Sequence, residues 1–175
     1  KAMGLSACQR WALTGSLATD LGNTALFGAL FNGARLVIAA PDDMQDGDHF
    51  AHFMSAADID ALKIVPSHLE ALLECEVPRL PKTLILGGEA TSSALLSSIA
   101  RISPECQLYN HYGPTEATVG VMVHPVSLAQ DIAGPLPLTQ LLPNCRYRVL
   151  DDNLHATPTG AVGELYLGGA QLARG

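Results

Sequence analysis

Short apolar runs alternate with stretches of helical periodicity through roughly the first 118 residues, and this order constrains the fold more than any other feature. The apolar runs, typical of strands buried on both faces, are residues 35–40, 61–65, 83–86 and 107–109. The stretches with helical character are residues 23–32, 48–57, 67–76 and 92–102. A β-α-β-α order predicts an α/β fold with a mostly parallel sheet covered by helices.

One of these helices has a specific start signal. Ser67 and Glu70 follow Pro66 with the spacing of a capping box, in which each side chain satisfies a free N–H group of the first turn. The sequence therefore predicts a capped helix start at Ser67.

The character of the chain changes after about residue 118. Residues 119–123, 147–150 and 163–167 are predicted strands, and the segments between them are rich in turn residues. We therefore expect an α/β subdomain over residues 1–130 and a smaller β-rich subdomain over residues 131–175.

Composition excludes several classes of partner. A net charge of −7 with only ten Lys and Arg residues disfavours nucleic acid, whose affinity rests on phosphate neutralisation. No apolar run approaches the ~20 residues that span a bilayer, so no membrane is expected. The cysteines are far apart and form no C-x-x-C motif, which favours a reducing cytoplasm over a zinc site or a disulfide framework.

Residues 110–116, Asn-His-Tyr-Gly-Pro-Thr-Glu, combine several groups suited to a nucleoside phosphate. Tyr112 offers an aromatic plane for a purine, and Gly113-Pro114 favours a turn. Thr115 supplies a hydroxyl for a phosphate oxygen, and Glu116 supplies a carboxylate for Mg²⁺. An ordinary turn between two strands is the alternative interpretation of this segment.

Two further segments carry a family resemblance together with this one. Residues 110–116 resemble the Asn-x-Tyr-Gly-Pro-Thr-Glu motif of amino-acid adenylation domains in nonribosomal peptide synthetases. Residues 163–175 resemble a later motif of the same domains, with Gln171 where Gly is usual, and residues 87–90 lie at the expected distance before the first motif. The resemblance implies an adenylate-forming enzyme, in which an amino-acid carboxylate attacks the α-phosphate of Mg-ATP. The acyl group then passes to the phosphopantetheine thiol of a carrier protein.

The resemblance also implies roles for individual residues. Thr115 would contact the α-phosphate as a catalytic group, and Glu116 would be catalytic by holding Mg²⁺. Tyr112 would stack on adenine. The nucleotide-binding positions implied in this way are Gly88, Glu89, Ala90, Asn110, Tyr112, Gly113 and Thr115.

A second set of positions implied by the resemblance would line the amino-acid pocket. These are Asp20, Leu21, Thr24, Lys63, Ile85, Gly87, His111, Val119 and Gly120. Asp20 would bind the α-ammonium group of the substrate. Its structural alternative is the N-cap of the following helix, because Asp is a favoured cap residue.

Lys63 indicates the side chain of the substrate. It interrupts an apolar predicted strand, where an unpaired ammonium is costly, so its charge should face a cavity or an anion. With His111 and the small Gly87, the pattern resembles that of aspartate-activating domains, and asparagine is the second choice. The alternatives are an edge-strand lysine reaching water and a packed or solvent-facing histidine.

The resemblance implies a longer parent protein with carrier and condensation domains. The family's phosphate loop would precede residue 1, and its ribose-binding Asp and catalytic Lys would follow residue 175. We therefore expect the 175 residues alone to catalyse little. Two rival functions stay open: an acyl- or aryl-CoA synthetase of the same superfamily, and a non-catalytic scaffold module.

Overall fold

A mostly parallel sheet forms the body of the protein. The computed structural model describes residues 3–129 and 134–174, so the expected boundary between residues 130 and 131 and the final Gly175 lie outside the described residues. Within them, seven strands follow the order β2-β1-β3-β4-β5-β6-β7, and β1 to β5 are parallel. The strands are β1 (Arg10–Leu13), β2 (Arg35–Ile38), β3 (Ala61–Ile64), β4 (Thr83–Gly87), β5 (Gln107–Tyr112), β6 (Met122–Val126) and β7 (Gln140–Leu141). This confirms the predicted α/β fold.

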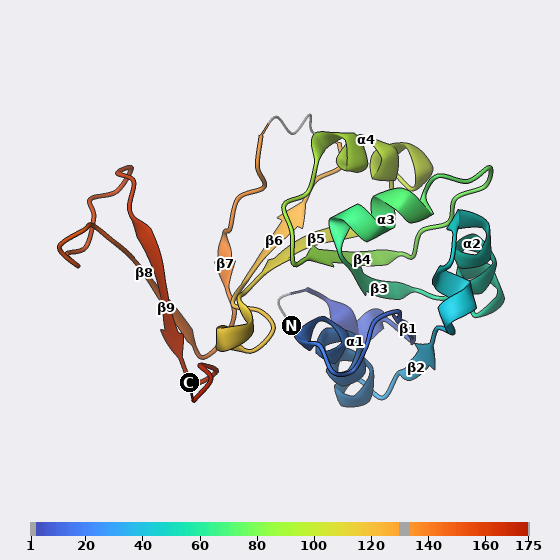
Figure 1. Cartoon of the computed structure of the whole chain (residues 1–175), viewed down its shortest axis with the longest axis horizontal. Helices are drawn as coiled ribbons and strands as arrows, with labels where there is room; N and C mark the ends of the chain where they lie inside the picture. Colours follow the sequence, from blue (N-terminus) through green and yellow to red (C-terminus); the bar gives the residue numbers. More distant parts are fainter. Residues whose placement is uncertain (1–2, 130–133, 175) are drawn as a thin grey trace.

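Helices cover both faces of the sheet, as Figure 1 shows. They are α1 (Asp20–Phe31), α2 (Gly47–Ala56), α3 (Pro66–Leu72) and α4 (Ser93–Ile102). Helices α2, α3 and α4 lie on one face, where Phe50, Leu69 and Ile99 are fully buried against the strands. Helix α1 lies on the other face, over Trp11. It approaches this closely because Gly28 has no side chain: a Cβ there would lie 2.9 Å from the indole ring.

The parallel register brings the predicted pocket residues to one face and one end of the sheet. Lys63 of β3 is paired with Ile85 of β4, and Gly87 of β4 is paired with His111 of β5. Paired residues of neighbouring strands point to the same face, here the face that α1 covers. Ligands of open α/β sheets bind at the carboxyl ends of the strands, where Gly87 and His111 lie.

The structure corrects several predicted boundaries. Strand β1 was not predicted, and helix α1 begins three residues before the predicted 23–32. The strand predicted over residues 119–123 begins only at Met122, as β6, because Thr118 and Val119 have positive φ angles of 53° and 73° and form a turn. The short 3₁₀ helices are η1 (Leu5–Ala7), η2 (Pro41–Met44) and η3 (Thr115–Ala117).

The predicted capping box at Ser67 is also wrong. Helix α3 begins at Pro66, its N-cap Val65 makes no side-chain hydrogen bond, and the helix ends at Leu72. The backbone N–H of Ser67 instead donates to the carboxylate of Glu89, 3.2 Å away. Glu89, which is remote in sequence, thus accepts the Ser67 N–H that Glu70 was expected to accept.

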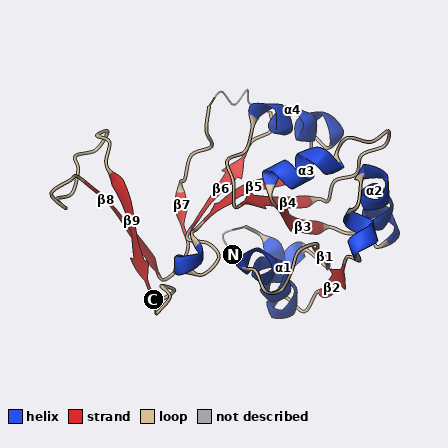
Figure 2. Ribbon diagram, in the orientation of Figure 1, coloured by secondary structure: helices blue, strands red, loops and turns tan. Residues whose placement is uncertain are grey.

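A separate two-stranded antiparallel sheet follows the main one. It consists of β8 (Cys145–Leu150) and β9 (Glu164–Gly169), and it stands apart from the helix-covered body in Figure 2. Strand β7 still belongs to the main sheet, through its pairing with β6. The division into residues 1–130 and 131–175 stays a prediction. Across residues 3–129 and 134–174, no helix is both long and apolar enough to cross a bilayer.

Candidate functional site

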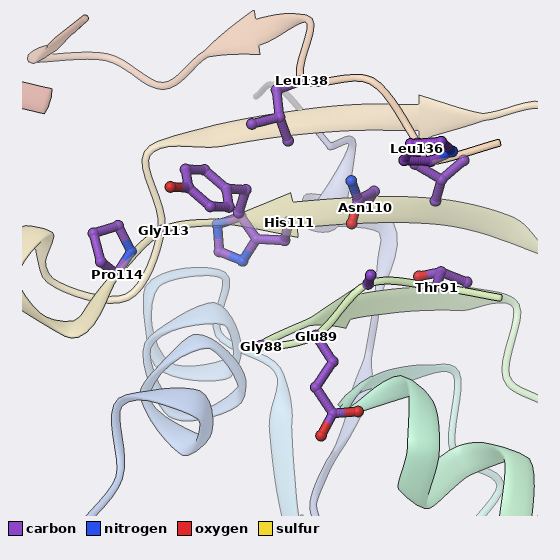
Figure 3. A pocket seen from close by; sticks show the side chains of 12 residues that line it. Gly88, Glu89, Thr91, Asn110, His111, Gly113, Pro114, Leu136 and Leu138 are labelled. Carbon is purple, nitrogen blue, oxygen red and sulfur yellow. The ribbon is translucent and has the colours of Figure 1, made fainter. Parts of the chain in front are cut away.

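A cavity of about 490 Å³ opens beyond the ends of β4 and β5. Figure 3 shows that its floor comes from Gly88 and Asn110 and that Leu136 and Leu138 face them from the opposite side. The lining residues are Gly88, Glu89, Ala90, Thr91, Asn110, His111, Tyr112, Gly113, Pro114, Pro135, Leu136 and Leu138. Six of the seven residues expected to bind the nucleotide line this single cavity, with Thr115 next in the chain.

Glu89 lines the cavity through its backbone and turns its carboxylate elsewhere. In Figure 3 the side chain points away from Asn110, and its carboxylate accepts the Ser67 N–H at the start of α3. Gly88 has a φ of 93°, a conformation that favours glycine, and this sharp turn is what carries the chain across the cavity floor. The backbone of Gly88 and Glu89 is therefore the part that can meet a flat ring.

The motif at residues 110–116 forms the end of β5 and the turn after it. Tyr112 is 38% exposed, so its ring can accept a planar partner on the cavity side. Gly113 permits a close approach of two backbone segments, because a Cβ there would lie 2.6 Å from the Cα of Gly120. The two ends of the connection between β5 and β6 are thus packed against each other.

A buried polar cluster lies beside the cavity, beneath α1. Lys63 is only 5% exposed, and its Nζ lies 3.0 Å from Oγ1 of Thr24 and 3.1 Å from Nδ1 of His111. The lysine therefore does not reach bulk water as an edge-strand residue would, and the imidazole of His111 is packed against Lys63. Three of the predicted pocket residues, from α1, β3 and β5, converge here.

Burial sets the charges in this cluster. Desolvation lowers the pKa of Lys63 to about 8, although the carboxylate of Asp20 acts in the opposite direction. Desolvation and the nearby charge of Lys63 lower the pKa of His111 to about 4. At neutral pH the ammonium of Lys63 therefore donates to a neutral imidazole, and Nδ1 of His111 is the acceptor.

Asp20 connects this cluster to the motif. It is the first residue of α1, whose N-cap is Thr19, so the alternative role of Asp20 as N-cap is wrong. Its Oδ2 accepts a hydrogen bond from Oγ1 of Thr115 at 3.0 Å. The carboxylate expected to bind an ammonium and the hydroxyl expected to face a phosphate are therefore neighbours, although 95 residues separate them in sequence.

Two of the remaining pocket positions are glycines that lie against His111. Gly87 and Gly120 are in close contact with the histidine: a Cβ at Gly87 would lie 2.5 Å from its backbone oxygen, and one at Gly120 would lie 1.8 Å from its Nε2. Val119 is half-buried beside Gly120. Ile85 is fully buried in the hydrophobic cluster under α1, and Leu21 is half-buried on α1 itself.

Glu116 lies in η3 and is exposed. No group of three or more His, Cys, Asp or Glu side chains that could hold a metal occurs in the described parts of the chain. A single carboxylate nevertheless fits Mg²⁺, which commonly uses one or two carboxylates together with substrate phosphates. The position of Glu116, next to Thr115, is consistent with that mode of binding.

Sequence reasoning missed several contributors to the site, among them Leu136, Leu138 and Gln171. Leu136 and Leu138 close one side of the cavity, and Gln171 donates to the backbone oxygen of Gly120 at 2.9 Å. The two leucines come from a turn-rich segment without periodicity, so no sequence pattern indicated them. For Gln171 the sequence did contain a signal, because a glutamine replaces the glycine that is usual at this position of the motif over residues 163–175.

Comparisons with known proteins agree with this geometry. The sequence matches the family model "AMP-binding enzyme" over residues 1–175. It is 38% identical to a linear gramicidin synthase of Brevibacillus parabrevis over 91% of this chain, and 33% identical to the dimodular nonribosomal peptide synthase of Bacillus subtilis, also over 91%. The chain spans only 3% and 7% of those two proteins.

Solved structures show the same fold. The N-terminal subdomain of NpsA from Klebsiella oxytoca, in complex with 3-hydroxybenzoyl-AMSN, superposes with a TM-score of 0.84 at 23% identity, covering 99% of this chain and 43% of that one. PA1221, a nonribosomal peptide synthetase protein containing adenylation and PCP domains, superposes with a TM-score of 0.84 at 22% identity, covering 98% and 36%. With the family model matched along its full length, and with segments of nonribosomal peptide synthetases as relatives, this chain belongs to the AMP-binding enzyme family.

Proposed function

We propose that this chain is the part of an adenylation domain that selects aspartate and places it against ATP. The observation that carries the proposal is the buried ammonium of Lys63, held by Thr24 and His111 next to Asp20. A site with one carboxylate and one ammonium complements a small zwitterion that has a second carboxylate.

The reaction joins the α-carboxylate of the amino acid to ATP. A carboxylate oxygen forms a bond to the α-phosphorus, the bond from that phosphorus to the bridging oxygen breaks, and pyrophosphate leaves. The α-ammonium and the reacting carboxylate share one carbon atom, so their binding groups must be close together. The 3.0 Å contact between Asp20 and Thr115 meets this requirement.

Positioning and electrostatics carry most of such chemistry. Thr115 would donate to an α-phosphate oxygen, and Tyr112 would stack on adenine above the backbone of Gly88. Glu116 would help to hold Mg²⁺, which would neutralise phosphate charge when bound. ATP and Mg²⁺ are therefore the expected co-substrate and metal.

Charge distinguishes aspartate from asparagine at this site. The side-chain carboxylate of aspartate would pair with Lys63, whereas the amide of asparagine would bring no charge to this buried ammonium, and Asp20 would be engaged by the α-ammonium of the substrate. Such a mismatch costs several kcal/mol, which is about 100-fold or more in kcat/KM. Aspartate is therefore the proposed substrate.

Transfer to a carrier protein is the second half of the proposal. PA1221 contains adenylation and PCP domains, and the relatives in sequence are peptide synthases. The aminoacyl group would pass to the phosphopantetheine thiol of a carrier domain and then serve a condensation domain of the parent synthetase.

Asp20 argues against the two rival functions. An acyl- or aryl-CoA synthetase has no substrate ammonium to bind, so it has no need of the carboxylate that Asp20 holds beside Thr115. A scaffold module would have no need to keep Thr24, Lys63 and His111 in a buried polar cluster.

Amino-acid-dependent ATP–pyrophosphate exchange tests the function. The parent protein is assayed with each of the amino acids and with benzoate and short fatty acids as controls without an α-ammonium. We expect exchange with aspartate far above every other acid. A preference for benzoate or a fatty acid would favour the synthetase alternative, and no exchange with any acid would favour the scaffold.

A further inference from the structure

Gln171 follows β9 and makes contacts that the usual glycine of its motif could not make in full. Its side-chain Nε2 donates to the backbone oxygen of Gly120 at 2.9 Å, and the residue is half-buried. Its own backbone oxygen accepts from Oγ1 of Thr118 at 2.6 Å. Gln171 therefore contacts the turn at residues 118–120 on both sides of Val119.

This turn is strained. Thr118 and Val119 have φ angles of 53° and 73°, and both are β-branched residues, for which the left-handed region is sterically unfavourable. Such conformations persist only where the surrounding structure fixes them. Within the turn, the Gly120 N–H donates to the Thr118 oxygen at 3.0 Å. The two hydrogen bonds of Gln171 join the Thr118 hydroxyl and the Gly120 backbone oxygen of this turn to a residue some 50 positions later in the chain.

The turn presses on the ring of His111. The Cα of Gly120 is so near the imidazole that a Cβ on it would lie 1.8 Å from Nε2. Nε2 is buried and has no hydrogen-bond partner among residues 3–129 and 134–174. Because no hydrogen bond fixes this side of the ring, contact with the Gly120 backbone is what holds it. The other side of the ring, Nδ1, meets Lys63 at 3.1 Å.

A continuous series of contacts therefore joins Gln171 to Gly120, Gly120 to the His111 ring, and the ring to Lys63. We propose that Gln171 is a positioning residue that sets the direction of the Lys63 ammonium, and so a determinant of side-chain specificity outside the pocket itself. This inference rests on the proposed function for its effect on substrate. The contacts themselves do not depend on it.

The test uses two substitutions of opposite hydrogen-bonding character in the parent protein. Gln171→Glu keeps the size of the side chain but removes the donor, whereas Gln171→Lys keeps a donor. Gln140→Glu, at an exposed position of β7, controls for the added negative charge. Gln171→Gly removes the side chain altogether. Because glycine is the usual residue at this position of the motif, we expect this variant to fold.

We expect Gln171→Glu and Gln171→Gly to raise the KM for aspartate about three- to tenfold, the effect of one neutral hydrogen bond. The KM for ATP should stay unchanged, and the preference for aspartate over asparagine should fall. Gln171→Lys should recover most of the wild-type KM, and Gln140→Glu should have no effect. An unchanged aspartate KM, or an equal loss for ATP and both amino acids, would overturn the inference.

Amide hydrogen exchange separates this inference from the proposed function. Peptides covering residues 112–121 should lose protection in Gln171→Glu and keep it in Gln171→Lys. If the wild-type protein does not activate aspartate, the proposed function fails, and the protection of this segment still decides the role of Gln171. Equal protection in all variants would refute that role.

Discussion

At the scale of single residues, burial gives Lys63 and His111 different charges at neutral pH. Burial lowers the pKa of Lys63 to about 8 and that of His111 to about 4, so near neutral pH the lysine is charged and the histidine is not. A charged histidine would repel the ammonium 3.1 Å away, whereas a neutral one can accept a hydrogen bond from it. The imidazole therefore orients the cation without neutralising it, as the proposed binding of a substrate carboxylate requires.

This charge state predicts a pH dependence of specificity. The pKa of Lys63 in the folded protein, about 8, lies below the ordinary 10.5, so the site loses its cation as the pH rises through about 8. Because kcat/KM reports groups of the free enzyme, the ratio of kcat/KM for aspartate to that for asparagine should be level below this pH. Above it the ratio should fall by up to about tenfold per pH unit.

Asparagine is the internal control in that experiment, since it differs from aspartate only in the side-chain group that would meet Lys63, and each rate is expressed per concentration of the α-ammonium form. The measurement is pyrophosphate exchange by the parent protein across a pH range that brackets the transition on both sides. A ratio that stays constant across this range would show that the Lys63 ammonium does not distinguish the side chain of aspartate from that of asparagine.

At the scale of elements, Gly120 makes the packing between β5 and the strained turn possible. Gly120→Ala would place a methyl group 1.8 Å from His111 Nε2, so we expect a loss of about 1–3 kcal/mol in the free energy of unfolding. Denaturant unfolding measures this. Gly15→Ala is the matched control, since a Cβ there meets no atom within 4 Å.

A double substitution tests the cause of that loss. His111→Ala removes the ring that the new methyl group would meet, so Gly120→Ala should cost much less in that background. Residues in contact typically show coupling energies of about 0.5–3 kcal/mol. Additive effects of the two substitutions would contradict the close contact.

The sequence predicted the elements that buried apolar runs define, and it failed where tertiary contacts override local signals. β3, β4 and β5 were expected near their observed positions because a short, mostly apolar run lies at each of them in the sequence. Residues 119–123 were expected to be a strand because Val119 and Val121 are β-formers, but the turn at Thr118 and Val119 is fixed by a segment some 50 residues away.

Individual site residues also fall into those that the sequence predicted and those that depend on tertiary contacts. The family resemblance implied that Lys63 and His111 share a pocket, and the structure has the two side chains in contact. The cost of burying an unpaired ammonium predicted only that the charge of Lys63 would face a cavity or an anion. The N–H of Ser67 was expected to be capped locally, yet Glu89 does this from 22 residues away. Contacts of that kind depend on how α3 packs against the end of β4, which no local pattern encodes.

At the scale of the whole molecule, the larger hydrophobic cluster and the polar cluster of the site lie on opposite faces of the sheet. The larger hydrophobic cluster lies under α2, α3 and α4, whereas the polar cluster lies on the opposite face, under α1. The cavity lies at the strand ends, next to that polar cluster. None of the twelve described residues that line the cavity is Lys or Arg.

We therefore expect the 175-residue chain alone to bind ATP weakly and to give no measurable amino-acid-dependent exchange. A triphosphate needs cationic side chains or aligned N–H groups, and the chain spans 43% of the NpsA subdomain it superposes on. Calorimetry with ATP and exchange assays should be run on the chain and on the parent protein in parallel. Exchange by the chain at a rate near that of the parent would disprove this expectation.

The most direct test of aspartate selection by Lys63 is the aspartate-to-asparagine ratio of exchange rates for Lys63→Met in the parent protein, with Lys82→Met as the control at an exposed lysine. Methionine fills a similar volume without charge, so the fold should persist. We predict that the Lys63→Met variant loses the preference for aspartate by about 100-fold or more while keeping the KM for ATP, and that Lys82→Met behaves like the wild type. An unchanged ratio in Lys63→Met, or an equal loss with both amino acids, would contradict the proposed role of this lysine.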